Sequence, residues 1–202
     1  MKSAIITAYK EERTIGNAIE RILKQLEKED ELIVLAPDKG TEKVVKDYKR
    51  KDKRIKFVKD PGNGKPTALN LALEIAKGDI LICTDGDVFI DENAIKELMK
   101  PFKINEVGAA TARPVSLNTR DTMLGYWSHL LTDAGAHKRR LSQRKKRKFI
   151  NVSGYLYGMR KGLIEKIPEQ TLSDDALISE KIWERKYDIV YVPNAKVYVR
   201  YP

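Results

Sequence analysis

The sequence of 202 residues contains one cysteine, Cys83, and two histidines. A single cysteine excludes a disulfide-bonded scaffold, and its place inside an apolar run suits a reducing compartment. No stretch approaches the roughly 18 consecutive apolar residues of a membrane-spanning helix, so we expect no transmembrane segment in the chain as given. The opening "MKSAIITAYKEE" turns to charge after a short apolar run, which is not the pattern of a signal peptide.

The chain also lacks a Gly/Ser-rich linker, an internal repeat and any shift in composition that would divide it. Because a domain typically holds about 100 to 200 residues, we expect one domain over 1–202. Apolar residues make up 42% of the sequence and charged residues 34%, which is the composition of a globular protein with a heavily charged surface.

Acidic residues are missing from 138–148, "KRRLSQRKKRK", which holds eight lysines and arginines. The whole chain has 39 basic and 29 acidic residues and a net charge of +10, so outside this segment the two signs almost balance. The basicity is therefore local, and it indicates one surface that attracts anions.

The first 90 residues alternate between strand-like and helix-like patterns. We expect strands over 3–9, 31–36, 54–60 and 79–84, and helices over 14–29, 41–51 and 65–77. In the third helix Pro66 lies in the first turn and Gly78 follows the last turn, which is the usual asymmetry of helix ends. This alternation predicts a largely parallel sheet, whose ligands gather at the carboxyl ends of the strands.

After residue 90 the alternation loosens, and the second half of the chain has an α+β character. We expect helices over 91–102, 122–141 and 174–186, and strands over 107–115, 149–160, 188–193 and 195–202. Together the two halves predict a single α/β domain with a mostly parallel mixed sheet flanked by helices.

The strand over 79–84 runs into Asp85 and Asp87, with Gly86 between them. Residues two apart in a strand point to the same side, with Cα atoms roughly 7 Å apart at a rise of about 3.3 Å per residue. Two converging carboxylates repel unless one is protonated or a cation lies between them, and Mg²⁺ is commonly held by one or two carboxylates plus substrate phosphates. The pair therefore predicts a divalent metal and a phosphate ligand together, with Gly86 leaving the backbone open to that ligand. A polar turn is the alternative explanation of "DGD" alone.

Two further segments point to the same chemistry. Residues 60–70, "DPGNGKPTALN", form a glycine-containing loop before a helix, where backbone amides favour anions and Lys65 adds positive charge. An ordinary β-turn explains this loop nearly as well, because its spacing is not that of a Walker A loop. Asp174 and Asp175 open a later helix, and a helix N-cap with an acidic first turn also accounts for them.

In their order, the three segments resemble the family-2 glycosyltransferases, inverting enzymes with the GT-A fold that transfer a sugar from a nucleotide-sugar donor. The resemblance rests on "IITAYKEERTIGNAIERIL", "GNGKPTALNLALEIAKGDILICTDGDVFIDENAI" and "SDDALISEKIWERKYDIVYVPNAKVYVRYP". The second stretch contains a D-x-D motif, and the third contains an acid pair and "VPNA". The chain departs from the family pattern in two places: Thr7 stands where proline is usual, and Ala36 and Pro37 stand where two acids often bind the nucleobase.

On the donor side, the resemblance implies a role for five residues. Tyr9 and Glu11 would contact the nucleotide, and Asp38 would serve in place of the missing acid pair. Lys65 would lie near the base or the diphosphate, and Asp85 would bind the ribose or assist the metal.

The resemblance also assigns the metal and the catalytic groups. Asp87 would ligate Mg²⁺ or Mn²⁺ on the donor diphosphate, with Asp85 as its neighbour. Asp175 would be the general base that accepts the proton of the acceptor hydroxyl, and Asp174 would stand in place of the family's usual glutamate. A single in-line displacement would then invert the anomeric centre.

The expected activity is that of a metal-dependent inverting glycosyltransferase of the hexosyltransferase type, which moves a sugar from a UDP- or GDP-sugar to an acceptor hydroxyl or a lipid phosphate. Residues 1–90 would form the nucleotide-sugar-binding half, and residues 91–202 the acceptor-binding half. A nucleotidyltransferase that releases pyrophosphate is an alternative, although it usually carries a glycine-rich loop near the first strand, which "TAYKEERT" lacks. A nucleic-acid-binding protein that uses 138–148 is another, and it leaves the acid motifs unexplained.

Residues 122–148 join an apolar stripe to the basic cluster. Helical spacing places on one face Met123, Leu124, Trp127, Leu130, Leu131 and Ala134. Such a segment can lie on an anionic membrane, and it would suit a lipid-linked acceptor at the membrane surface. A core-packing helix followed by a solvated basic loop has the same periodicity. The expected location is therefore the cytoplasm, including the inner face of the cell membrane.

Overall fold

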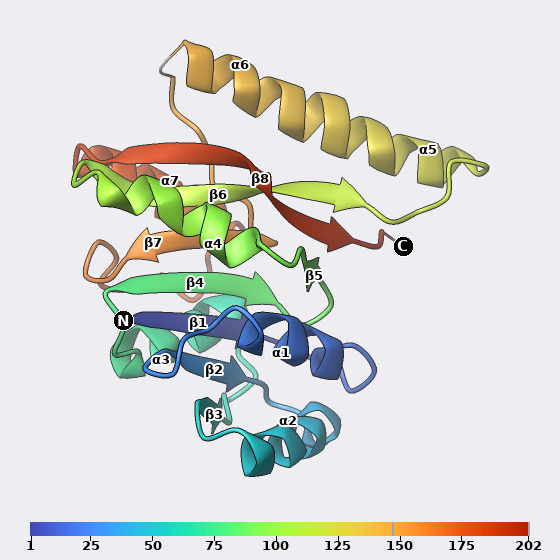
Figure 1. Cartoon of the computed structure of the whole chain (residues 1–202), viewed down its shortest axis with the longest axis vertical. Helices are drawn as coiled ribbons and strands as arrows, with labels where there is room; N and C mark the ends of the chain where they lie inside the picture. Colours follow the sequence, from blue (N-terminus) through green and yellow to red (C-terminus); the bar gives the residue numbers. More distant parts are fainter. Residues whose placement is uncertain (147, 202) are drawn as a thin grey trace.

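A computed structural model describes residues 1–146 and 148–201 and centres on one eight-stranded sheet (Figure 1). The predicted strand 195–202 and the basic cluster 138–148 each contain one residue outside this range, Pro202 and Arg147. The strands are β1 (Lys2–Thr7), β2 (Glu31–Leu35), β3 (Ile55–Val58), β4 (Ile80–Asp85), β5 (Phe89–Ile90), β6 (Val107–Ser116), β7 (Leu156–Arg160) and β8 (Asp188–Val199). They lie side by side in the order β3-β2-β1-β4-β7-β6-β8-β5.

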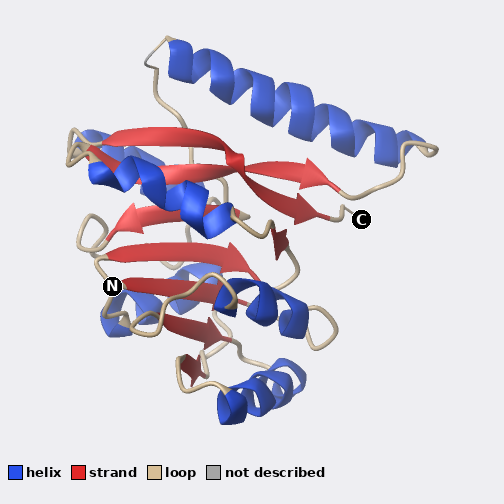
Figure 2. Cartoon of the chain, viewed as in Figure 1, coloured by secondary structure: helices blue, strands red, loops and turns tan. Residues whose placement is uncertain are grey.

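Helices cover both faces of this sheet (Figure 2). They are α1 (Ile15–Leu23), α2 (Lys39–Lys51), α3 (Lys65–Ile75), α4 (Ala94–Met99), the short 3₁₀ turn η1 (Lys100–Lys103), α5 (Met123–Leu130), the π-helical η2 (Leu131–Lys138), α6 (Arg139–Lys145) and α7 (Asp174–Glu184). Among the described residues, none of these helices is long and apolar enough to cross a membrane.

The core has two parts, one on each face of the sheet. Successive side chains of a strand point to opposite faces, so Ala4 and Ile6 of β1 join the helices α1, α2 and α4, whereas Ile5 packs with α3 and α7. Strands buried on both faces read as continuous apolar runs, as in "ELIVL" of β2. The predicted α/β fold with helices on both sides of a mixed sheet is confirmed.

The first four strands are parallel. β1 pairs with β2 and with β4, and β2 pairs with β3, so their carboxyl ends meet at one edge of the sheet. The helix predicted over 14–29 is shorter than expected, because α1 ends at Leu23. Leu26 lies beyond the end of this helix and is still buried in the core. Its helical spacing therefore predicted its burial correctly, but not its conformation.

The second half of the sheet departs from the parallel pattern. β7 lies between β4 and β6 and is antiparallel to both, and it is much shorter than the predicted strand 149–160. The two separate strands predicted over 188–193 and 195–202 are wrong, because β8 is one strand beside β6. Its register shifts between the pairs Ala112–Val192 and Arg113–Lys196, so Pro193, which has no amide hydrogen to donate, lies in a bulge.

Candidate active site

A cleft of about 580 Å³ opens at the carboxyl ends of β1 and β4. Four segments, one after each of the strands β1 to β4, line it: Thr7, Ala8, Tyr9, Glu11, Pro37, Asp60, Gly62, Gly64, Lys65, Ala68, Asp85, Gly86 and Asp87. Five of the predicted site residues are therefore brought together here, from the loops after β1 and β4 and from the start of α3. The parallel arrangement of the strands causes this convergence.

An ion pair between Lys65 and Asp85 lies at the base of the cleft. Lys65 Nζ is 2.6 Å from Asp85 Oδ1, and the two side chains are only 29% and 25% exposed. Thr7 Oγ1 donates to the same carboxylate oxygen at 3.3 Å. Burial raises the pKa of Asp85, and repulsion from Asp87 adds to this effect, so Lys65 offsets it only in part.

Lys65 also reaches a second carboxylate. Its Nζ lies 4.0 Å from Asp174 Oδ2 at the start of α7. Burial disfavours a charged lysine, but the attraction of Asp85 and Asp174 is stronger and raises the pKa of Lys65. Burial likewise raises the pKa of Asp174, whose Oδ2 accepts no hydrogen bond within the described chain. One lysine thus links the end of β4 to the first turn of α7.

Asp175 is held by three hydrogen bonds at the same end of the site. Ser173 Oγ donates to its Oδ1 at 2.6 Å, and the Ala176 amide donates to the same oxygen at 2.9 Å. The Gly154 amide donates to Oδ2 at 3.3 Å. A Cβ atom on Gly154 would lie 3.6 Å from Lys65 Nζ and 3.7 Å from Asp175 Oδ2, so this glycine occupies the gap between the two groups.

The side chain of Asp38 holds the loop after β1 in place through hydrogen bonds. The amides of Lys10 and Thr41 both donate to the Asp38 carboxylate at 2.8 Å. Burial opposes the charge of Asp38, but these amide hydrogen bonds outweigh it and lower its pKa. Lys10 has a φ of 58°, a left-handed conformation that this capping stabilises, and Tyr9 beside it is 62% exposed.

Asp38 therefore caps α2 and shapes the Tyr9–Glu11 loop, and among the described residues it is not part of the cleft lining. Gly86 lines the cleft and also has a packing role. A Cβ atom there would lie 2.8 Å from the Cβ of Ala8, so only glycine allows the loops after β1 and β4 to approach this closely. The close approach places Asp85 and Asp87 beside the first loop.

The donor set for a divalent metal is small. Within residues 1–146 and 148–201, no three His, Cys, Asp or Glu side chains converge on one point. Asp87 is exposed at the cleft, whereas Asp85 is already paired with Lys65. Such a set fits Mg²⁺ or Mn²⁺ when phosphate oxygens of a ligand supply the remaining bonds, which is how Mg²⁺ is usually held.

Three residues of the site were absent from the predicted set. Thr7 and Gly154 contact the charged groups directly, and Asp60 lines the cleft and accepts a hydrogen bond from the Gly62 amide at 2.7 Å. Asp60 carried a sequence signal, since it opens the glycine loop. Gly154 carried none, because its place beside Asp175 depends on the antiparallel insertion of β7.

Known proteins with similar sequences include a polysaccharide synthase and a glycosyltransferase. The chain is 25% identical to the poly-beta-1,6-N-acetyl-D-glucosamine synthase of Staphylococcus epidermidis, over 99% of this chain and 50% of that protein. It is 29% identical to an uncharacterized glycosyltransferase of Methanocaldococcus jannaschii, over 77% of this chain and 50% of that protein. The chain therefore spans about half the length of these curated relatives.

Solved structures share the fold at low sequence identity. TarS residues 1–349 of S. aureus superpose with a TM-score of 0.73 at 19% identity, covering 99% of this chain and 60% of that one. GalNAc-T7, solved with UDP, GalNAc and Mn²⁺, superposes with a TM-score of 0.75 at 17% identity, covering 100% of this chain and 43% of that one. These likenesses confirm the GT-A fold.

The family model described as "Glycosyl transferase family 2" matches residues 3–167. This range includes β1 from its second residue, the glycine loop and the whole of the cleft lining, and it stops short of Asp174 and Asp175. Because this match covers most of the chain and the fold agrees with it, the chain belongs to glycosyl transferase family 2.

Proposed function

We propose that the protein is a metal-dependent inverting glycosyltransferase that transfers a hexose from a UDP- or GDP-sugar. The observation that carries the proposal is the position of Lys65 between Asp85 on the donor side and Asp174 on α7. Residues 1–90 hold the nucleotide-sugar in this assignment, and residues 91–202 receive the acceptor. The cleft and the Asp175 carboxylate then lie on opposite sides of the reacting carbon.

UDP-N-acetylglucosamine is the first donor to test. TarS has been solved with UDP and with UDP-GlcNAc, and the staphylococcal relative is named as a synthase of poly-N-acetylglucosamine. Tyr9 offers an exposed ring for stacking on a nucleobase, and Glu11 lines the same side of the cleft. Both contacts suit a uridine or a guanosine.

Asp87, with Asp85 beside it, would hold Mg²⁺ or Mn²⁺ together with the donor diphosphate. A bound metal supplies a Lewis acid for the negative charge that grows on the leaving nucleoside diphosphate. Lys65 adds a fixed positive charge at the same end of the cleft, because its two carboxylate neighbours keep it protonated. The chain therefore binds and orients the diphosphate from two sides.

Asp175 acts as the general base in this proposal. Ser173, Ala176 and Gly154 hold its carboxylate in one orientation, which is what a base must have to meet the acceptor hydroxyl. The proton moves from the acceptor oxygen to Asp175 as that oxygen attacks the anomeric carbon, and the diphosphate leaves from the opposite face. One such displacement inverts the configuration.

The acceptor is a hydroxyl group or a lipid phosphate, and a lipid-linked acceptor would place the enzyme at the inner face of the cell membrane. Residues 122–148 are the part of the chain that we expect to face that membrane. Nucleic acid is a poor candidate as a partner, since it accounts for the basic residues and leaves the cleft without a role.

Product analysis tests the proposal. We expect UDP-GlcNAc or another nucleotide-sugar to release a nucleoside diphosphate in the presence of Mn²⁺ or Mg²⁺, and chelation to abolish the release. The Asp87→Asn variant should lose metal-dependent donor binding in calorimetry, while Glu92→Gln on the neighbouring loop serves as a control for lost charge. Release of pyrophosphate would instead identify a nucleotidyltransferase and overturn the proposal.

A further inference from the structure

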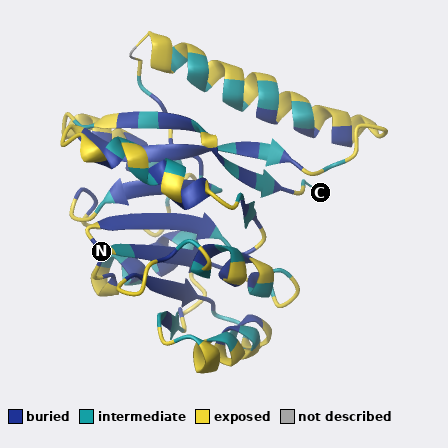
Figure 3. Cartoon of the chain, in the orientation of Figure 1, coloured by how far each residue is buried: buried dark blue, intermediate teal, exposed yellow. Residues whose placement is uncertain are grey.

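The continuous helix formed by α5, η2 and α6 has its apolar side chains on the outside. Met123 is 75% exposed, Leu124 67% and Trp127 53%, and Tyr126, Leu130 and Leu131 are exposed as well. The helix lies along β6 and β8 at the edge of the molecule, with its exposed residues on the far side from the sheet (Figure 3). The core-packing alternative for the apolar stripe of 122–134 is therefore wrong.

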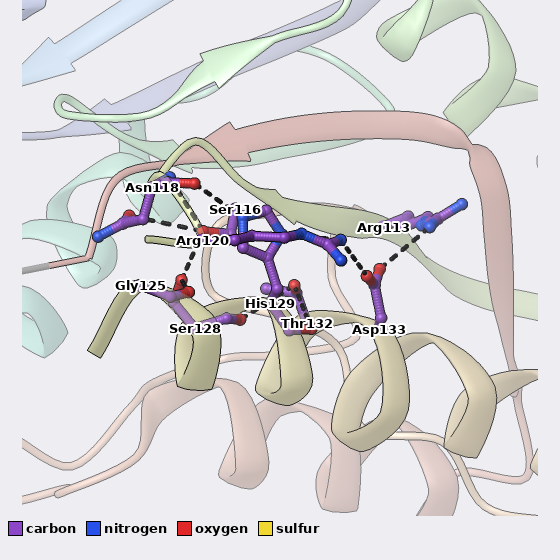
Figure 4. Close-up of polar contacts among 9 residues, drawn as sticks. All are labelled: Arg113, Ser116, Asn118, Arg120, Gly125, Ser128, His129, Thr132 and Asp133. Carbon is purple, nitrogen blue, oxygen red and sulfur yellow. Dashed lines mark hydrogen bonds and ion pairs between the residues drawn. The ribbon is translucent and has the colours of Figure 1, made fainter. Parts of the chain in front are cut away.

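Polar groups form the side of the helix that faces the sheet (Figure 4). Ser128 Oγ lies 2.7 Å from Ser116 Oγ of β6, and His129 Nε2 donates to the Asn118 carbonyl at 2.7 Å. Ser128 is buried, although it lies between the exposed residues Trp127 and Leu130 in the sequence. In this part of the helix, polar side chains are therefore buried and large apolar side chains are exposed.

Two further contacts fix the helix farther along. Asp133 lies between Arg113 of β6 and Arg120, with N···O distances of 3.3 and 3.6 Å. His137 Nδ1 lies 2.7 Å from the hydroxyl of Tyr191 on β8. Each of these bonds would break if the helix rotated to bury its apolar side, so the outward orientation is built into the fold.

An exposed apolar face of this kind marks an interaction site, because monomeric soluble proteins rarely expose a contiguous patch of large apolar side chains. Positive charge follows directly along the same helix. The basic residues exposed at its carboxyl end are Lys138, Arg139, Arg144, Lys145 and Lys146, and the sequence from 134 to 146 contains no acid. The partner must therefore be apolar in one part and negatively charged in another.

We propose that this outward face, residues 123–146, docks the protein on an anionic lipid bilayer. Trp127 and its apolar neighbours would enter the boundary between headgroups and acyl chains, and the lysines and arginines would contact lipid phosphates. A second copy of this chain is a poorer occupant, because two like-charged clusters would repel each other. Nucleic acid is poorer as well, since the apolar part of the face would stay uncovered.

The underside of the same helix leads toward the proposed base. Arg140 Nε donates to the Asn151 carbonyl at 3.3 Å, and the segment that begins at Asn151 continues to Gly154, which contacts Asp175. A docked helix would therefore hold the acceptor side of the cleft near the lipid surface. This last step rests on the proposed function, whereas the membrane contact itself does not.

Vesicle co-sedimentation without any sugar donor tests the docking. We expect the protein to bind vesicles of phosphatidylcholine mixed with phosphatidylglycerol at low salt, and to bind phosphatidylcholine vesicles far less. Replacing Leu124 and Trp127 by serine should lower the partition coefficient by roughly a hundredfold, because two large side chains no longer enter the bilayer. Replacing Lys145 and Lys146 by glutamate should lower it by at least about tenfold and weaken its dependence on salt.

Matched variants elsewhere on the surface separate a specific face from general stickiness. Leu172→Ser removes another fully exposed leucine, and glutamate at Lys49 and Lys51 inverts charge at the end of α2. Both should bind vesicles as the wild type does. All variants alter exposed side chains, so their melting temperatures should match the wild type, and this measurement verifies that they fold.

Four results would overturn the proposal. The first is a wild-type protein that does not sediment with anionic vesicles at low salt. The second is that the serine and glutamate variants bind vesicles as well as the wild type and the matched control variants do. The third is a dimer in sedimentation velocity that dissociates on the serine substitutions, which would assign the face to a second copy. The fourth is salt-sensitive binding of an oligonucleotide without vesicle binding. Each result is independent of whether sugar transfer is found.

Discussion

The parallel strands of residues 1–90 and the helix of residues 123–145 bury opposite kinds of side chain. In β1 and β2 nearly every apolar residue is in the core, and polar groups appear where the strands end. In the helix, Leu124 and Trp127 face outward and Ser128 lies against the sheet.

The difference shows how much the spacing of apolar residues in a sequence can predict. Helical spacing tells which residues share a face, and it leaves open which face is turned toward the core. In the strands no such question arose, because both faces were apolar. In the helix it was decided by partners far away in the sequence, such as Arg113 and Tyr191.

The largest expected effect separates sugar transfer from the binding that we assign to the two regions. Asp175→Asn should lower the transfer rate by about 10² to 10⁴, since general-base help is of that size, while UDP binding and vesicle binding stay as in the wild type. Rates from quenched reactions and UDP calorimetry provide the measurements. Glu180→Gln, an exposed acid on the same helix, is the control, and wild-type rates in Asp175→Asn would remove the base assignment.

A pair of leucines tests the burial contrast itself. Leu81 in β4 is fully buried, so Leu81→Ala should lower the free energy of unfolding by about 2–5 kcal/mol. Leu131→Ala removes the same atoms from the outer helix face and should change it by less than about 0.5 kcal/mol. Urea unfolding measures both, and equal losses would show that the helix packs against something in solution.

Breaking an ion pair should likewise cost more stability at the cleft than at the outer helix. Lys65→Met leaves Asp85 and Asp174 buried without their cation and should cost about 1–3 kcal/mol of stability. Asp133→Asn breaks the more exposed pairs with Arg113 and Arg120 and should cost at most about 1 kcal/mol. Comparable costs for the two variants in urea unfolding would contradict the contrast.

The smallest effect concerns pH. Burial raises the pKa of Asp174 above the value of 3.8 that it has without a protein environment, so the folded state binds its proton more tightly than the unfolded state. Its ionisation therefore costs stability, and the cost appears as the pH rises from 3.8 through the raised pKa. We expect Asp174→Asn to unfold at a slightly higher temperature than the wild type at pH 7 and to match it at acidic pH. A variant that is less stable at pH 7 would show that the pairing with Lys65 dominates.

Much of the cleft could be predicted from the sequence. Its residues follow directly on strands and helices with clear patterns, so Tyr9, Lys65, Asp85 and Asp87 were expected at one edge of the sheet and lie around one cleft. Asp38 shows the limit of this reasoning. Its amide partners, Lys10 and Thr41, give it a place under the first loop that no spacing could indicate.

The surroundings of Asp175 were harder to predict because their contacts are set by topology. Gly154 meets Asp175 and Lys65 only since β7 runs antiparallel beside β4. The sequence also did not predict that β8 continues through its bulge, because Pro193 and Asn194 have the pattern of a turn between two strands. Both features depend on pairing partners that lie far away in the chain.

The insertion of β7 between β4 and β6 also governs when the site can form. Thr84 pairs with Leu156, so the end of β4 and the segment of Gly154 join through a contact between distant parts of the chain, which we expect to form late in folding. Synthesis proceeds from the N-terminus, and the parallel donor half can assemble while β7 is still being made. A nascent chain that stops at the end of β6 would therefore hold the residues that line the cleft, and it would lack Gly154 and Asp175.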